Sequence, residues 1–181
     1  MVEHVREHSL IGQPDHGRIR PLKRAEIYRV LDRMTEGLPK AGRILLVPPD
    51  ITRLYSYAGV ITSYLYKKLS VDALVRILPA TGTHRPMTPG ERCRFFGRDI
   101  PDHAFLIHDW CRDTVDIGTV PGAYCAQVPA GRYTGDICAQ VNHHIVDQSF
   151  DLILSIGQVV PHEVTGMSNY TKNILVGLGG R

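Results

Sequence analysis

The chain has 181 residues, of which 43% are hydrophobic and 22% are charged, and its formal net charge is +3. This length suits one domain with its own core, or one domain and the start of another, and the composition excludes disordered and fibrous proteins. Because the positive charge is small and no block of five Lys or Arg residues occurs, we expect no nucleic-acid partner.

Targeting and redox features of the sequence favour a cytoplasmic protein. The apolar runs are short, as at residues 44–47, so no segment is predicted to span a membrane. The N-terminus is polar and lacks the apolar core of a signal peptide. The four cysteines form no C-x-x-C pair, which disfavours a structural zinc site, and we expect them to be reduced thiols.

The chain is predicted to begin with a loose arm over residues 1–20, followed by a folded domain over residues 21–181. Residues 22–34 favour a helix with Ile27, Val30 and Leu31 on one face. The continuous apolar run 43–47 is typical of a buried parallel strand. Ser56 is expected to cap a second helix with an apolar stripe that comprises Val60, Ile61, Tyr64, Leu65 and Leu69.

The next stretch repeats this strand–turn–helix pattern. A strand over 73–78 leads into a turn at 80–86, and a helix follows with a capping box formed by Thr88 and Glu91. Further strands are predicted at 104–107 and 151–156, with mixed strand and loop over 114–146 and a loop over 157–166.

These units in series predict an α/β fold with a mostly parallel sheet and helices on both faces, a Rossmann-like domain. In such sheets ligands bind outside the carboxyl ends of the strands. The last residues, 178–181, follow an apolar stretch directly and include a Gly-Gly pair. We therefore expect the chain to be truncated before a second α/β domain.

Polar residues follow the first predicted strand at positions 50–53. Arg53 could clamp a carboxylate or phosphate, with Asp50 and Thr52 orienting it or binding a hydroxyl. The alternative is an Asx turn beside a surface arginine.

The second predicted strand is followed by the polar segment 81–85. Gly82 allows close approach of the backbone to a ligand, and His84 could act as an acid or base beside Thr83. A polar turn with a solvated histidine is the alternative. Neither a phosphate loop of the P-loop type nor a G-x-G-x-x-G fingerprint occurs, which disfavours nucleoside-triphosphate enzymes and ordinary Rossmann dehydrogenases.

The last predicted strand is followed by His162 and Lys172. A desolvated lysine amine could serve as a covalent attachment point, although a lone lysine at a helix start is more often solvated. His108 and Asp109 are adjacent on an extended segment and would point to opposite faces, so a structural or supporting role is favoured. The remaining histidines considered, His103 and the pair 143–144, are interpreted as ordinary surface or strand residues.

Together these segments resemble the lactate racemase family, enzymes that use a nickel-pincer nucleotide. The resemblance covers roughly residues 40–181 and rests on four motifs in order: Asp50-x-Thr52-Arg53, the run from Gly82 to Thr88, His108-Asp109, and Pro161-His162 followed by Gly166 and Lys172.

The resemblance implies a role for each matched residue. His84 and His162 would be the two acid/base histidines, one for each face of the substrate's α-carbon. Arg53 and Asp50 would bind the substrate. Lys172 would bond covalently to the nickel-pincer nucleotide through a thioamide, with Thr52 and Thr83 also at the cofactor. The nickel-ligand histidine is expected downstream of Arg181, so no metal ligand is assigned in this chain, which alone would be inactive.

The substrate implied is a 2-hydroxy acid, whose racemisation needs two opposed bases and a hydride acceptor. The chain differs from the lactate enzymes at residues 54–56, where they have proline-containing segments, and at 169–171, where they are glycine-rich. A different 2-hydroxy acid or a sugar acid is therefore expected. The alternatives are a non-enzymatic domain that binds a carboxylate or phosphate, and a zinc hydrolase, which the ligand spacing disfavours.

Overall fold

The protein is described by a computed structural model that covers residues 22–127, 133–162 and 166–180. It forms two compact units, residues 1–40 and 41–181. In the first unit, α1 (Arg24–Glu36) matches the helix predicted over 22–34, and Leu31 on its apolar face is buried. The predicted arm over residues 1–20 lies outside the described residues.

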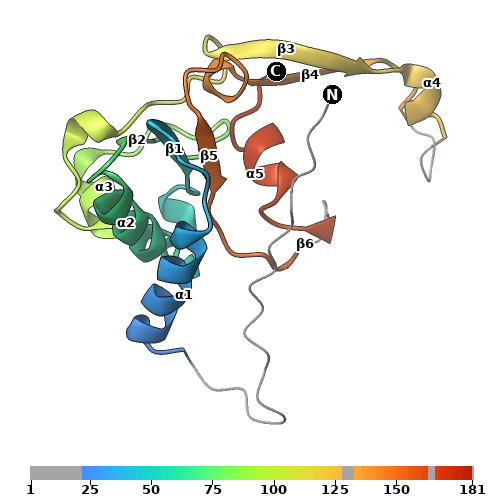
Figure 1. Cartoon of the computed structure of the whole chain (residues 1–181). Helices are drawn as coiled ribbons and strands as arrows, with labels where there is room; N and C mark the ends of the chain where they lie inside the picture. The colour runs from blue at the N-terminus through green and yellow to red at the C-terminus, as the bar shows by residue number, and fades with distance from the viewer. Residues whose placement is uncertain (1–21, 128–132, 163–165, 181) are drawn as a thin grey trace. The chain divides into compact units, whose positions relative to one another are not determined.

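The second unit contains a parallel sheet with strand order β2-β1-β5 (Figure 1). Its strands are β1 (Arg43–Val47), β2 (Leu74–Ile77) and β5 (Leu152–Ser155). The central strand β1 has neighbours on both sides, and its four apolar residues are buried, as the continuous apolar run predicted. The α/β class with a mostly parallel sheet is therefore confirmed.

The strand predicted at 104–107 is wrong in extent. Phe105 forms a single parallel bridge with Ile77, and the Leu106 amide donates to the Ile77 carbonyl at 2.8 Å. A 3-10 turn, η2 (Asp102–Ala104), occupies the start of the segment, and Ile107 at its end is 59% exposed. Only two residues thus remain extended beside β2, which is too few for a ladder.

Two helices follow β1 and β2. The first, α2 (Ala58–Leu69), comes after a 3-10 helix, η1 (Ile51–Ser56). Ser56 was expected to be the cap, but Tyr57 occupies that position with a left-handed φ of 65° because η1 extends through Ser56. The second, α3 (Pro89–Phe96), begins with the predicted capping box of Thr88 and Glu91.

Helices cover both faces of the sheet: α2 and α3 lie on one side, and α5 (Thr171–Leu175) lies on the other (Figure 1). Successive side chains of a strand point to opposite faces, so Leu45 and Val47 share the α5 side of β1. There they form a buried cluster with Leu78, Val141 and Leu178, against which Ile174 of α5 packs. This packing holds α5 against that face of the sheet.

The segment from 114 to 146 contains an antiparallel pair, β3 (Thr114–Val120) and β4 (Ile137–Asn142), with α4 (Gly122–Cys125) after β3 and a 3-10 turn, η3 (His143–Ile145), after β4. The predicted loop over 157–166 is partly wrong, because β6 (Pro161–His162) pairs there with β7 (Gly166–Met167). Within the described residues, no helix is both long and apolar enough to cross a membrane.

Candidate functional site

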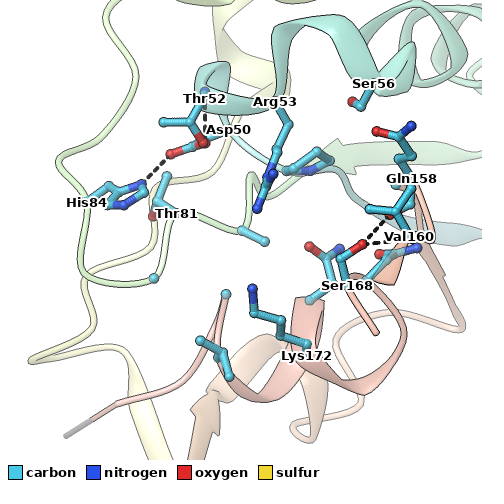
Figure 2. A pocket seen from close by; sticks show the side chains of 18 of the residues that line it. Asp50, Thr52, Arg53, Ser56, Thr81, His84, Gln158, Val160, Ser168 and Lys172 are labelled. Carbon is cyan, nitrogen blue, oxygen red and sulfur yellow. Dashed lines mark hydrogen bonds and ion pairs between the residues drawn. The ribbon is translucent and has the colours of Figure 1, made fainter. Parts of the chain in front are cut away.

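A cleft of about 390 Å³ opens at the carboxyl ends of the parallel strands (Figure 2). It is lined by the segments after β1, β2 and β5 and by α5, which is the edge that the strand order predicts. Six of the seven predicted site residues line it: Asp50, Thr52, Arg53, Thr83, His84 and Lys172. The seventh, His162, is not among the lining residues and reaches the cleft through its contact with Lys172.

Asp50 orients His84. The Asp50 carboxylate is buried, and its Oδ2 lies 2.7 Å from His84 Nδ1. Its other oxygen, Oδ1, accepts the Thr52 amide at 3.0 Å and the Thr52 hydroxyl, so the carboxylate cannot rotate freely. An ionised carboxylate accepts a hydrogen bond from Nδ1–H, which leaves Nε2 of a neutral imidazole as the base. Asp50 was expected to bind substrate or to orient Arg53, whereas its observed partners are His84 and Thr52.

The loop that carries His84 is held at both ends. Gly82 adopts a φ of 54°, and its amide donates to the Gly177 carbonyl at 2.7 Å. Arg85 forms a two-bond ion pair with Glu91, at 2.9 and 2.6 Å, and this pairing with the backbone bond from Thr88 lowers the pKa of Glu91 to about 2. Arg85 thus ties the loop to the first turn of α3.

Arg53 is available for an anion. Its side chain lines the cleft, is exposed, and has no ion-pair or hydrogen-bond partner among the described residues. In Figure 2 the guanidinium extends from η1 toward the cleft between Asp50 and Lys172. A guanidinium in this position can form two parallel hydrogen bonds with a carboxylate or phosphate.

Lys172 and His162 form the second polar pair of the site. Lys172 is partly buried on α5, and its Nζ lies 3.1 Å from His162 Nε2. The two residues come from different elements, since His162 belongs to the short strand β6. An amine that lines the cleft and has a basic neighbour is suited to covalent attachment.

Lys172 is held in position by polar contacts of neighbouring residues. The sequence did not reveal these contacts. Asn173 donates to the Val47 carbonyl at 2.9 Å and to Ser155 Oγ at 3.1 Å, which fastens α5 to the ends of β1 and β5. Ser168, which is buried, donates to the Gln158 carbonyl at 2.8 Å and accepts the Val160 amide at 3.0 Å. Neither residue belongs to a motif, and each becomes recognisable only once the strand ends are adjacent.

The backbone before Lys172 has an unusual conformation. Asn169 and Tyr170 have φ values of 61° and 49°, in the left-handed region that favours glycine. Asn169 also lines the cleft. Asparagine adopts this region more readily than most residues, whereas for tyrosine it is uncommon and must be held by the surrounding structure.

His108 has the structural role that its sequence context favoured. It is buried, its Nε2 lies 3.2 Å from the Gly179 carbonyl, and its Nδ1 lies 3.1 Å from Asn142 Nδ2. The Asn142 side-chain oxygen accepts the His144 amide, so the Asn142 amide nitrogen must face the histidine, and Nδ1 must be the acceptor. The neutral Nε2–H form is therefore favoured, and burial lowers the pKa of His108.

These features define an α/β domain whose cleft combines an oriented histidine, a lysine–histidine pair and an arginine that has no ion-pair partner among the described residues. The profile of the lactate racemase N-terminal domain matches residues 23–181, and the chain belongs to this family.

One characterised relative and two solved structures are similar to this chain. The lactate racemase of Lactiplantibacillus plantarum is 29% identical over 150 residues, which cover 81% of this chain and 32% of that protein. The crystal structure of a Thermotoga maritima protein has a TM-score of 0.78 and 28% identity over 88% of this chain and 39% of its own. The lactate racemase apoprotein of Thermoanaerobacterium thermosaccharolyticum has a TM-score of 0.61 and 25% identity over 84% of this chain and 37% of its own. The chain thus spans about a third of the length of these relatives.

Proposed function

We propose that this chain supplies part of the active site of a 2-hydroxyacid racemase or epimerase that uses a lysine-linked nickel-pincer nucleotide. The observation that carries the proposal is the presence of two histidines with different partners: His84, which lines the cleft, with Asp50, and His162, beside the cleft, with Lys172. Racemisation requires two proton carriers that approach the same carbon from different sides, and these two histidines come from different segments of the chain.

His84 is the base for one face of the substrate. With Nδ1–H held by Asp50, the lone pair on Nε2 can take the proton of the substrate hydroxyl. His162 serves the other face and takes or returns the proton for the opposite enantiomer. Arg53 holds the substrate carboxylate, because it is the guanidinium in the cleft that no described acidic residue neutralises.

The cleft residues fit the implied cofactor. The volume of about 390 Å³ lies within the range of small-molecule and cofactor sites. Lys172 would carry the nucleotide, and Thr52 and Thr83 would bind its polar groups. The Thr81 hydroxyl in the cleft wall is buried without a hydrogen-bond partner among the described residues, so one more polar contact is available there. When bound, the nickel-pincer nucleotide would accept and return the hydride of the α-carbon.

The substrate is a 2-hydroxy acid other than lactate, or a sugar acid. Two positions at which the chain departs from the lactate enzymes, Ser56 and Asn169, line the cleft. Gln158 lies in the same cleft and adds an amide that can bind a further hydroxyl. Polar groups of this kind are left unpaired by a substrate as small as lactate.

The proposal is tested by the mass and nickel content of the full-length protein, matured with the enzymes that make the cofactor. Wild type should carry added mass on Lys172 and one nickel ion, and Lys172→Ala should carry neither. Lys40→Ala is the matched control, because Lys40 is exposed and lies outside the cleft, and it should retain both. A Lys172→Ala protein that kept the added mass and the nickel would overturn the assignment.

The same residues also suit a domain that binds a carboxylate or phosphate without chemistry, because Arg53 has no acidic partner in the described part of the chain and can pair with either anion. Calorimetric titration of the 181-residue chain with lactate and with inorganic phosphate, in the presence of a chelator, tests this alternative. Tight binding that Arg53→Ala abolishes would favour the binding domain.

A further inference from the structure

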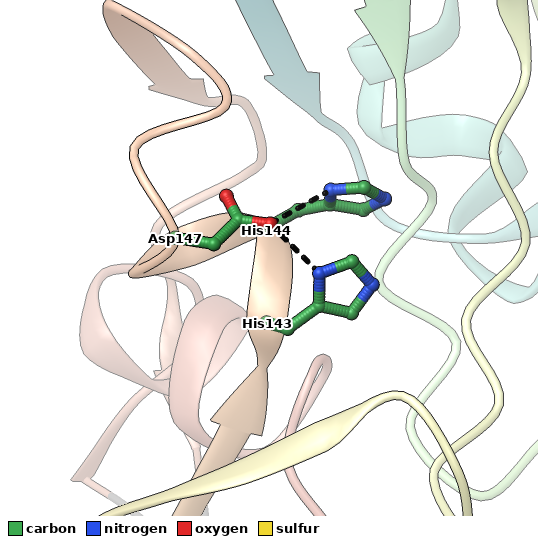
Figure 3. A group of neighbouring side chains, drawn as sticks. All are labelled: His143, His144 and Asp147. Atoms are coloured by element: carbon green, nitrogen blue, oxygen red, sulfur yellow. Dashed lines mark hydrogen bonds and ion pairs between the residues drawn. The ribbon is translucent and has the colours of Figure 1, made fainter.

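A cluster of potential metal ligands lies outside the cleft, at the turn between β4 and β5. It consists of His143, His144 and Asp147, each of which offers one ligand atom, and these three atoms lie within 4.8 Å of one another (Figure 3). None of the three residues lines the cleft. Their side chains are 41%, 25% and 34% exposed, so an ion and its water ligands have access from solvent.

The donor atoms lie at distances that suit a shared ion. Asp147 Oδ2 lies 2.8 Å from His143 Nδ1 and 3.7 Å from His144 Nδ1. Ions that bind at about 2.0–2.2 Å hold neighbouring ligand atoms roughly 3–3.5 Å apart, and the two observed distances bracket that range. Figure 3 shows both Nδ1 atoms directed at the same carboxylate oxygen.

The backbone brings the three side chains together. Asn142, which is fully buried, caps η3 by accepting the His144 amide at 3.1 Å. The Asp147 amide then donates to the His143 carbonyl at 2.9 Å, so the chain turns back and places the carboxylate beside both imidazoles. The arrangement therefore follows from a turn fastened to a buried residue.

Neighbouring groups hold the ligands in place. Asp147 Oδ1 accepts the Ser149 amide at 2.9 Å and also the Ser149 hydroxyl, which leaves Oδ2 directed at the histidines. The His144 ring packs against Phe150, with ring centroids 5.7 Å apart, and against His143, at 4.0 Å. Groups that orient the ligands in this way are typical of protein metal sites.

We propose that His143, His144 and Asp147 form a second binding site, for a divalent transition-metal ion such as zinc, nickel or cobalt. Two imidazoles and one carboxylate form a donor set that suits these ions, and water completes the coordination. The site is separate from the cleft and does not depend on the proposed racemase activity, so either proposal can fail while the other stands.

The test uses cobalt and zinc as probes on the purified 181-residue chain, stripped of metal. We expect one ion to bind, visible as cobalt d–d absorption that zinc abolishes by displacement, and as a higher thermal unfolding temperature with zinc. The double variant His143→Asn/His144→Asn and the single variant Asp147→Asn should lose this absorption and the zinc-dependent shift. Ser149→Ala should weaken binding by about 10- to 100-fold, because it removes a group that orients Asp147.

Other histidines provide the controls. His103→Asn should bind cobalt as wild type does, because His103 is exposed and lies outside the cluster. A variant in which His4, His8 and His16 are all replaced by Asn should also bind normally, as should His162→Asn beside the cleft. The proposal is wrong if wild type binds no ion. It is also wrong if cobalt binding is lost when the N-terminal histidines or His162 are replaced. Thermal unfolding of each variant without metal shows whether that variant is folded. If the double variant is not folded, the single variant Asp147→Asn gives the decisive result.

Discussion

Asp50 and His84 lie 34 positions apart in the sequence, yet Asp50 Oδ2 is 2.7 Å from His84 Nδ1. The two residues follow neighbouring parallel strands, and the bridge between Pro49 and Ala80 continues the pairing of β1 and β2 up to the cleft. The sheet thus brings together a buried carboxylate and an exposed imidazole. This pairing gives His84 a defined tautomer and orientation.

The pairing predicts that Asp50→Asn in the loaded, full-length protein lowers the rate of interconversion about 10²- to 10⁴-fold. The asparagine amide would face Nδ1 and favour the tautomer with the proton on Nε2, where a base is needed. The measurement is kcat and KM for both enantiomers, and the loss should fall mainly on kcat. Asp72→Asn, at an exposed position, is the control. A kcat equal to that of wild type would exclude an orienting role for Asp50.

Replacing either histidine of the proposed acid–base pair is expected to abolish interconversion in the full-length protein. His84→Ala and His162→Ala each remove one proton carrier, and the expected loss is at least about 10²-fold for each. Nickel content should be retained in His84→Ala, which separates loss of catalysis from loss of cofactor. His103→Ala should behave as wild type, and a wild-type exchange rate in either site variant would refute the two-base mechanism.

The buried His108 is expected to make the free energy of unfolding depend on pH. Burial lowers its pKa in the folded chain, while the Gly179 carbonyl, Asp113 and Asp109 oppose that shift. The unfolded chain therefore binds more protons than the folded chain as the pH falls through the ordinary histidine value of about 6.5, and stability decreases there. His108→Gln can keep both hydrogen bonds but does not titrate. Urea unfolding from pH 8 to pH 5 should show a smaller loss for His108→Gln than for wild type, and equal losses would contradict the prediction.

The close approach between the His84 loop and the segment after α5 predicts that Gly177→Ala is destabilising. A Cβ at Gly177 would lie 2.5 Å from the Asn173 carbonyl oxygen and 2.6 Å from Ala80 Cβ. Relief of this overlap must move backbone beside Lys172, at a cost of about 1–3 kcal/mol in the free energy of unfolding.

The matched control for that substitution is Gly90→Ala, in the first turn of α3. A Cβ at Gly90 meets no atom within 4 Å, and we expect a gain of about 0.4–1 kcal/mol from the lower entropy of the unfolded chain. Urea denaturation of the 181-residue chain measures both variants. A Gly177→Ala chain as stable as Gly90→Ala would show that the two segments can separate at no cost.

The sequence alone predicted the features that depend on neighbouring residues. The apolar run of β1, the capping box of α3 and the polar residues that follow each strand are local patterns, and the structure contains all three. The parallel order of strands then sufficed to predict which edge of the sheet would carry the cleft. The errors at Ser56 and at residues 104–107 arose where 3-10 turns replace helix starts or strand residues.

Only the tertiary structure decided which side chain meets which. The partner of Asp50 is His84, Arg85 pairs with Glu91, and Asn173 fastens α5 to two strands. Hydrogen bonds of this kind depend on distances set by strand order and helix packing. Local patterns determine the conformation of each segment, whereas side-chain contacts form only after the segments have packed together.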